Sequence, residues 1–162
     1  MKSFNIRVYG FLLDDQSRLL ISDEEQAGMR FTKLPGGGLE LGEGLRDALM
    51  REFEEECSLK VEVLDHVHTT DICVPSVFND TQVISVYYLV SARQEDLNRL
   101  PTSTIPFDFG NAIDESENED KQSFRWVSLK EFNEEQLTFE IDRLGWRAFK
   151  KLFPNDVDES QG

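Results

Sequence analysis

The opening of the chain alternates between apolar and polar side chains, which is the pattern of a half-buried β-strand. The two alternating sets are Phe4, Ile6 and Val8 on one side and Asn5, Arg7 and Tyr9 on the other. A polar turn at 14–17 and a second apolar stretch at 18–22 follow, so we expect a hairpin at the start of the chain. A polar loop at 23–28 then leads to a short strand at 30–33.

The middle of the chain combines a helix with further strands. The periodicity between Leu45 and Cys57 is helical, and strands are expected near 60–70 and 83–90. The stretch 83–90 is almost entirely apolar and rich in β-branched and aromatic residues. It should therefore be a central strand that is covered on both faces.

The last part of the chain predicts a short strand at 124–127 and an amphipathic helix. The helix is marked by apolar residues at helical spacing, at Ile141, Leu144, Ala148 and Leu152, and Pro154 should end it. Because helices and strands are intermixed, the fold class should be α/β or α+β, with a mixed β-sheet between helices. The length of 162 residues suits one domain, which we expect over 1–154, followed by a frayed tail at 155–162.

The segment 36–44 is rich in glycine and holds five of the chain's ten glycines. Such density indicates a backbone that turns tightly, adopts positive φ or approaches a ligand closely. The segment runs directly into the helix at 45–57, so its backbone carbonyls could join side chains of the helix in one site.

The helix at 45–57 places acidic groups where apolar ones belong. On a helical wheel Glu52 and Glu56 flank Leu45 at about 20° on either side, within the face that should be buried. Their mutual repulsion and the negative end of the helix dipole are unfavourable unless a cation is bound. A solvated acidic face is the alternative, but it does not explain charges on the buried side. Oxygen ligands without His or Cys favour Mg²⁺, with Mn²⁺ also possible.

The spacing of these residues resembles the Nudix box, G-x5-E-x7-R-E-U-x-E-E-x-G-U, in which U is a bulky apolar residue. Eight of the nine fixed positions agree, and they are Gly37, Glu43, Arg51, Glu52, Phe53, Glu55, Glu56 and Leu59. The exception is Ser58, where the family has a glycine that ends the helix in a left-handed conformation. Serine in that conformation should cost about 1 kcal/mol of stability.

The resemblance to MutT-like Nudix hydrolases implies an α/β/α sandwich and a nucleotide pyrophosphohydrolase. The substrate would be a nucleoside diphosphate linked to a group X, such as a nucleoside triphosphate, an oxidised one or ADP-ribose. By position, the implied ligands of Mg²⁺ are Glu52, Glu55, Glu56 and the Gly37 carbonyl, while Arg51 and Glu43 would orient them. The general base is open between Glu52 and Glu119, and Asp114, Glu115 and Glu117 compete with Glu119.

The charge of the chain limits the partners that we expect. With 32 Asp+Glu against 17 Lys+Arg, the formal net charge is −15, which disfavours nucleic acids and anionic membranes as partners. A small anionic nucleotide would then need the metal ion as its cationic partner. A homodimer is possible, since dimers are common among Nudix proteins. Cys57 and Cys73 form no motif, and neither a signal peptide nor a membrane span is evident, so we expect a cytoplasmic protein.

Other functions fit parts of the sequence. A Nudix domain that senses a nucleotide without hydrolysing it is the main alternative, although such domains often lose box glutamates that this chain keeps. An acidic Ca²⁺-binding protein is disfavoured because no D-x-[DN]-x-[DN]-G loop is present. His66 and His68 share one strand face, which is too few ligands for a zinc site. Phe78, Tyr87 and Phe107 could stack on a base, but core packing is the simpler interpretation.

Overall fold

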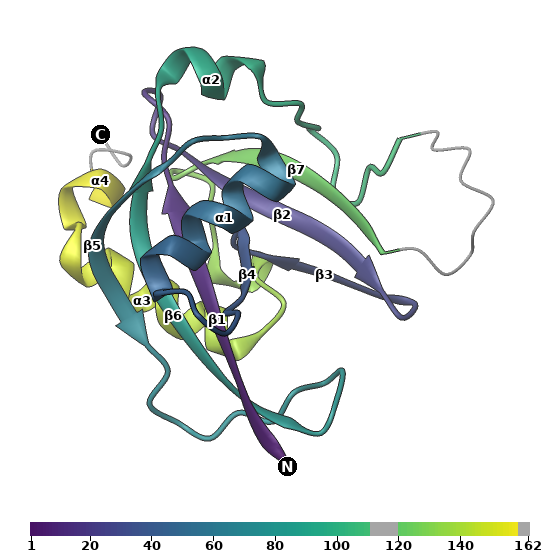
Figure 1. Ribbon diagram of the computed structural model, residues 1–162. Helices are drawn as coiled ribbons and strands as arrows, with labels where there is room; N and C mark the ends of the chain where they lie inside the picture. The colour runs from purple at the N-terminus through teal and green to yellow at the C-terminus, as the bar shows by residue number, and fades with distance from the viewer. Residues whose placement is uncertain (111–119, 159–162) are drawn as a thin grey trace.

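Seven strands form two sheets in the computed structural model, which describes residues 1–110 and 120–158 (Figure 1). The four-stranded sheet has the order β4 (Gly36–Gly38), β1 (Ser3–Leu12), β6 (Thr81–Ser91) and β5 (Glu62–Thr69). The three-stranded sheet has the order β3 (Met29–Lys33), β2 (Arg18–Gln26) and β7 (Lys121–Ser128). In the larger sheet β1 and β6 are parallel, whereas β4 and β5 pair antiparallel with their neighbours.

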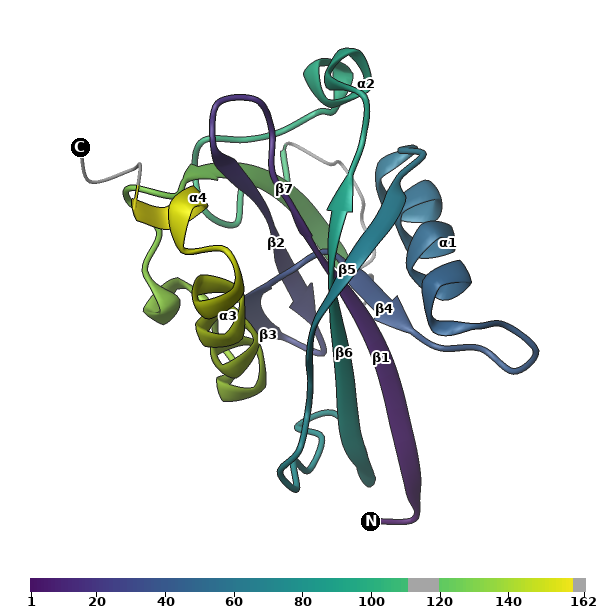
Figure 2. The same cartoon turned by 90° about the vertical axis from the view of Figure 1, so that its left-hand side faces the viewer.

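Helices lie on both sides of the strands. Figure 2 shows α1 (Leu45–Cys57) on one side and α3 (Glu140–Leu152) on the other. The shorter helices are α2 (Gln94–Arg99), the 3₁₀ turn Glu134–Gln136 and α4 (Pro154–Asp158). The predicted fold class, an α/β/α sandwich with a mixed sheet, is confirmed, with the strands divided between two sheets. In the described part of the chain, no helix has the length and apolar character needed to cross a bilayer.

The central strand was predicted correctly. β6 lies between β1 and β5, and its residues from 85 to 88 are buried. Val86 and Tyr88 pack into a core cluster with Leu49 and Phe53 of α1, while Tyr87 packs into a second cluster with Trp146 of α3. Each face of the strand therefore contributes to a separate apolar core.

The predicted opening hairpin is wrong. β1 and β2 belong to different sheets, and an isolated bridge between Leu13 and Leu19 joins their ends. β1 instead pairs with β6 over ten residues, from Ser3 opposite Thr81 to Leu12 opposite Val90, and with β4 on its other edge. With both edges paired, β1 has no edge left for β2.

The predicted polar loop at 23–28 is also wrong, because β2 continues to Gln26. Asp23 is fully buried in this strand and accepts hydrogen bonds from both Nε and Nη2 of Arg125 on β7 and from the Thr32 hydroxyl on β3. The carboxylate therefore joins all three strands of the smaller sheet. Charge alone suggested a loop, but a buried acid with this many donors can lie within a strand.

The terminal helix is confirmed, but its buried face differs from the predicted one. The buried residues of α3 are Ile141, Asp142, Gly145, Trp146 and Phe149, whereas Leu152 is 54% exposed. A Cβ at Gly145 would lie 3.1 Å from the Tyr87 ring, so the helix packs very close to the sheet at this point. The large aromatic side chains determine the buried face of α3. Pro154 follows the end of α3 as predicted and begins α4.

Candidate active site

Strand β4 consists of three glycines and lies against α1. A Cβ at Gly37 would be 2.5 Å from Cδ of Glu52, a distance that no side chain could tolerate without displacing the carboxylate. At Gly36 a Cβ would be 2.0 Å from the Val8 carbonyl oxygen, and its φ of +145° also favours glycine. The first three residues of the glycine-rich segment 36–44 therefore form a short strand, and the missing side chain at Gly37 leaves room for the Glu52 carboxylate.

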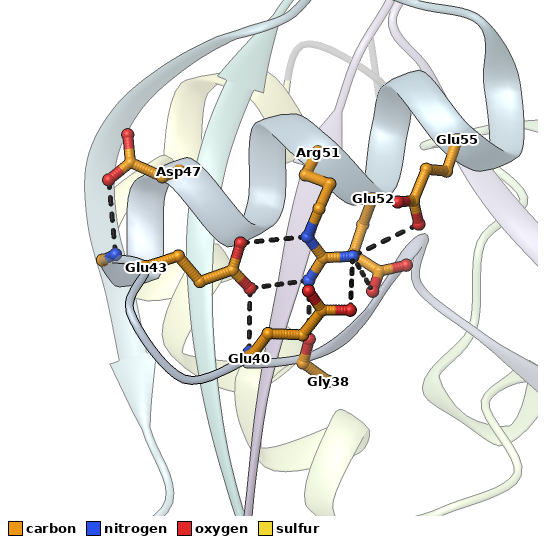
Figure 3. Close-up of polar contacts among 8 residues, drawn as sticks. Gly38, Glu40, Glu43, Asp47, Arg51, Glu52 and Glu55 are labelled. Atoms are coloured by element: carbon orange, nitrogen blue, oxygen red, sulfur yellow. Dashed lines mark hydrogen bonds and ion pairs between the residues drawn. The ribbon is translucent and has the colours of Figure 1, made fainter.

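Arg51 is the centre of the acidic cluster on α1 (Figure 3). Its Nε and Nη2 donate to the two oxygens of Glu43, at 2.9 and 2.6 Å, in a bidentate ion pair. Its Nη1 donates to Glu52 at 3.0 Å and to Glu55 at 3.2 Å, and Nη2 also donates to the Gly38 carbonyl at 3.0 Å. These hydrogen bonds from Arg51 lower the pKa of Glu43 to about 2, so Glu43 stays ionised at neutral pH.

The helix presents its glutamates to three different environments. Glu52 is 12% exposed, Glu55 is 60% exposed, and Glu56 is partly buried. Among the described residues, Oε2 of Glu56 is buried without a hydrogen-bond partner. Burial raises the pKa of Glu56 to about 7. The sequence correctly predicted that Glu52 and Glu56 lie toward the buried side, and Glu56 is a carboxylate in need of a partner.

A cavity of about 340 Å³ lies between the two sheets, on the face of β1 that carries Arg7 and Tyr9. Its walls come from both sheets, the loop 72–79 and the first turn of α3. Phe31, Phe78 and Phe139 form an aromatic wall, with ring centroids 5.3–6.3 Å apart. A flat aromatic ligand could pack against such a wall.

Charged and polar groups line the rest of this cavity. Lys33 is 5% exposed, pairs with Glu24 at 2.9 Å and donates to the Gly36 carbonyl at 3.1 Å. Asp142, from the first turn of α3, is 2% exposed and accepts a hydrogen bond from the Tyr87 hydroxyl. Burial raises the pKa of Asp142 to about 6. The cavity therefore combines an apolar wall with a few fixed polar groups, as ligand sites commonly do.

A second hollow of about 730 Å³ is lined in part by Glu56. It is lined by the end of α1, by α2 and the chain after it, and by β7. Glu56 therefore borders this hollow, while Glu52 borders the glycine strand.

The comparison with protein families identifies the fold. The model of the NUDIX domain matches residues 3–145. The chain belongs to the NUDIX domain family. This NUDIX domain is similar in fold to several solved structures, and the family match and these hydrolase folds support the predicted enzyme class, a pyrophosphohydrolase.

Three of these structures illustrate the similarity. A MutT protein from Methanosarcina mazei Go1 is 18% identical with a TM-score of 0.60, and 96% of each chain is covered. A NUDIX hydrolase from Nitrosomonas europaea is 15% identical with a TM-score of 0.63, covering 91% of this chain and 88% of that one. An ADP-ribose pyrophosphatase from Streptococcus suis is 15% identical with a TM-score of 0.53, covering 98% and 92%. At these identities the likeness concerns the fold.

The NUDIX domain brings together most of the residues that the motif singled out. Arg51 contacts Glu43, Glu52 and Glu55, and Glu52 lies against Gly37. In the residues that the structure describes, however, no three acidic, His or Cys side chains are gathered closely enough to hold a metal ion. Glu119 and its competitors Asp114, Glu115 and Glu117 lie outside the described residues.

The remaining sequence candidates have separate positions. His66 contacts the Thr69 hydroxyl at 2.8 Å, while the His68 ring packs against Tyr87, so the two rings have different neighbours. Tyr87 is a core residue, as the simpler interpretation predicted, and Phe107 packs against Phe109. Of Phe78, Tyr87 and Phe107, Phe78 lines the 340 Å³ cavity.

The cavity is not evident from the sequence pattern, because its walls are far apart along the chain. Arg7, Lys33 and Asp142 all line it, but they come from β1, β3 and α3. Alternation along β1 placed Arg7 on the polar face of a strand, without showing what covers that face. A signal was available in Asp142, a carboxylate among the apolar residues at the start of a core-facing helix.

Proposed function

We propose that this NUDIX domain hydrolyses a nucleoside diphosphate linked to a group X. Water would add across one P–O bond of the diphosphate, so that both products end in a phosphate group. The observation that carries the proposal is the partly buried Glu56, whose Oε2 has no hydrogen-bond partner among the described residues, on the same helix as Glu52 and Glu55. An unpaired carboxylate oxygen in this position is explained by a cation that the reaction requires.

The residues proposed to hold that cation are Glu52, Glu55, Glu56 and the carbonyl of Gly37. Hydrolases of this family generally use divalent metal ions, and we propose Mg²⁺ here, with Mn²⁺ as the other candidate. The fit rests on the all-oxygen donor set, on the unpaired Glu56 oxygen and on the space that the missing side chain of Gly37 leaves for the Glu52 carboxylate. In the described residues no three of these side chains are gathered, so the glutamates would have to turn toward one another around the ion. When bound, the ion would neutralise diphosphate oxygens and lower the pKa of a water molecule.

The other residues of the motif act by holding these groups in place. The bidentate Arg51–Glu43 pair fixes the guanidinium, and the guanidinium holds Glu52 and Glu55 at 3.0 and 3.2 Å. We assign Glu52 as the residue that accepts the proton of the attacking water on a carboxylate oxygen. Glu119 is the alternative base.

The nucleoside is proposed to bind in the 340 Å³ cavity beside β4. The aromatic wall of Phe31, Phe78 and Phe139 would stack on the base, and the polar groups on the opposite side would fix its orientation. Group X would then extend past Glu56 toward the larger hollow. The diphosphate would lie between the two, across the glycine strand.

The test compares Glu56→Gln with Glu54→Gln. Glu54 is exposed and lies on the same helix, so the control changes the charge equally without touching the proposed site. Each protein is incubated with Mg²⁺ and a panel of nucleoside triphosphates, ADP-ribose and UDP-sugars, and the phosphate products are identified. We expect Glu56→Gln to lower kcat at least about 100-fold, because a ligand of the ion is lost.

The controls separate the possible outcomes. Glu54→Gln should retain the wild-type rate, and equal rates in the two variants would contradict the proposal. Tight nucleotide binding without turnover of any substrate in the wild type would instead support the nucleotide-sensing alternative.

A further inference from the structure

Arg7 is a partly buried cation without a carboxylate partner. It lies on β1 and faces the 340 Å³ cavity, and its Nε donates to the Tyr9 hydroxyl at 2.5 Å. Burial raises the pKa of Tyr9, so the phenol stays neutral. Glu24 and Glu52 act on Arg7 through their charge, but neither forms an ion pair with it. In the described part of the chain, the guanidinium has no other hydrogen bond and no ion pair.

The other inward-facing cations differ from Arg7 in this respect. Lys33 pairs with Glu24 at 2.9 Å, Arg125 with Asp23 at 2.5 Å, and Arg51 with Glu43 at 2.6 Å. The chain carries a net charge of −15, so carboxylates are abundant. A guanidinium has five N–H donors and Tyr9 takes one of them, which leaves the others for a ligand in the cavity that Arg7 lines. Such a cation suits an anionic ligand better than a structural role.

The position of Arg7 indicates which anion it would meet. Arg7 is opposite Gly38 in the β1–β4 pairing, and its Nη1 lies 3.8 Å from where a Gly38 Cβ would be. The neighbouring Gly37 faces Glu52 in the same way. Since successive residues of a strand point to opposite faces, Arg7 and Glu52 flank the edge strand β4 on its two sides. The guanidinium therefore lies on the cavity side of β4, and Glu52 lies on the other side of the same strand.

We propose that Arg7 binds the 5′-phosphate of the nucleotide, the group that joins the nucleoside to the bond that is cleaved. The inference rests on the proposed function, because it places the nucleoside in the 340 Å³ cavity and the diphosphate at β4. Guanidinium binds phosphate with two parallel N–H···O hydrogen bonds, and Tyr9 holds the side chain in place through Nε. Arg7 thus anchors the phosphate from the side opposite to Glu52.

Binding without metal tests this separately from catalysis. In EDTA, calorimetry would measure the affinity of adenosine, AMP, guanosine and GMP for wild type, Arg7→Gln and Arg30→Gln. Arg30 is exposed and pairs with Glu25, so its variant changes the net charge equally. We expect the wild type to bind at least one monophosphate about tenfold or more tightly than its nucleoside. Arg7→Gln should abolish that difference, and Arg30→Gln should retain it.

The outcomes distinguish this inference from the proposed function. If nucleosides bind but the added phosphate brings no gain, or the gain survives in Arg7→Gln, the role of Arg7 is contradicted and the cavity assignment stands. If neither nucleosides nor monophosphates bind, the role of Arg7 and the assignment of the cavity to the nucleoside are both contradicted.

A kinetic measurement guards against a purely structural effect. Arg7→Lys keeps the charge and should retain part of the phosphate gain even if Arg7→Gln does not fold. In Arg7→Gln the KM of the hydrolysed nucleotide should rise at least about tenfold while kcat changes less. A fall in kcat with unchanged KM would contradict a binding role.

Discussion

Ser58 shows how closely a single residue can be predicted from a motif. It has φ 52° and ψ 32°, the left-handed conformation that the family's glycine adopts at the end of this helix. Its N–H donates to the Glu54 carbonyl and the Leu59 N–H donates to the Phe53 carbonyl, which closes α1. The motif predicted both the conformation and its strain.

Ser58→Gly should therefore stabilise the protein. Relief of left-handed strain is worth about 1–2 kcal/mol, and the greater freedom of glycine in the unfolded chain offsets part of it. We expect a net gain of about 1 kcal/mol, or a rise in Tm of about 2–4 °C, measured by urea and thermal unfolding. Ser58→Ala keeps the strain and serves as the control. A glycine variant no more stable than the alanine variant would contradict this account.

Asp142 gives the stability a specific pH dependence. Its pKa rises from 3.8 to about 6, mainly through burial, while the Tyr87 hydrogen bond, Lys33 and Arg7 lower it and Glu24 raises it. Between about pH 4 and pH 6 the folded protein holds this proton more readily than the unfolded chain does. The stabilisation from this group is therefore present below pH 4 and is lost as the pH rises through 6.

The side chain in Asp142→Asn cannot ionise, so the variant should not lose stability as the pH rises through 6. Its amide oxygen can still accept the Tyr87 hydrogen bond. The unfolding free energy of the variant, relative to wild type, should rise by on the order of 2 kcal/mol between pH 4 and pH 7. The exposed Glu62, changed to Gln, provides the control and should show a smaller change. A pH-independent difference for Asp142→Asn would rule out this explanation.

At the scale of elements, local patterns were predicted and pairings were not. The helix α1, its buried glutamates and the strand β6 follow from periodicity within one segment. The hairpin was wrong because β1 pairs with β6, some 78 residues later, and this competition between edges cannot be seen in a local pattern. The short strand β4 was missed because glycines carry no periodicity of their own.

The two neighbouring glycines of β4 test how this element positions Glu52. A Cβ at Gly37 would lie 2.5 Å from the Glu52 carboxylate, whereas one at Gly38 would meet its nearest atom at 3.8 Å. Gly37→Ala should therefore displace Glu52 and lower kcat about 100-fold, because small misplacements at a reacting centre are costly. Gly38→Ala is the control and should stay within about threefold of wild type. Steady-state kinetics measures both, and equal effects would show that β4 does not position Glu52.

At the scale of the whole molecule, the motif predicted one half of the site and the fold supplies the other. The glutamates, Arg51 and Gly37 lie within 20 residues of sequence, so their spacing could be interpreted directly. The cavity is built from β1, β2, β3, β6, the loop 72–79 and α3, and only the packing of two sheets brings these together. The net charge of −15 belongs to the whole molecule, and it would make the proposed cation at Glu56 more important for binding an anionic nucleotide.

Direct binding of Mn²⁺ tests the central claim, that the glutamates of α1 hold a divalent cation. Electron paramagnetic resonance detects free Mn²⁺, and its signal would be followed as wild type, Glu56→Gln or Glu54→Gln is added. We predict a saturable site in wild type and in Glu54→Gln, with affinity at least about tenfold weaker in Glu56→Gln. Equal Mn²⁺ binding by all three proteins, or no binding by the wild type, would contradict the account.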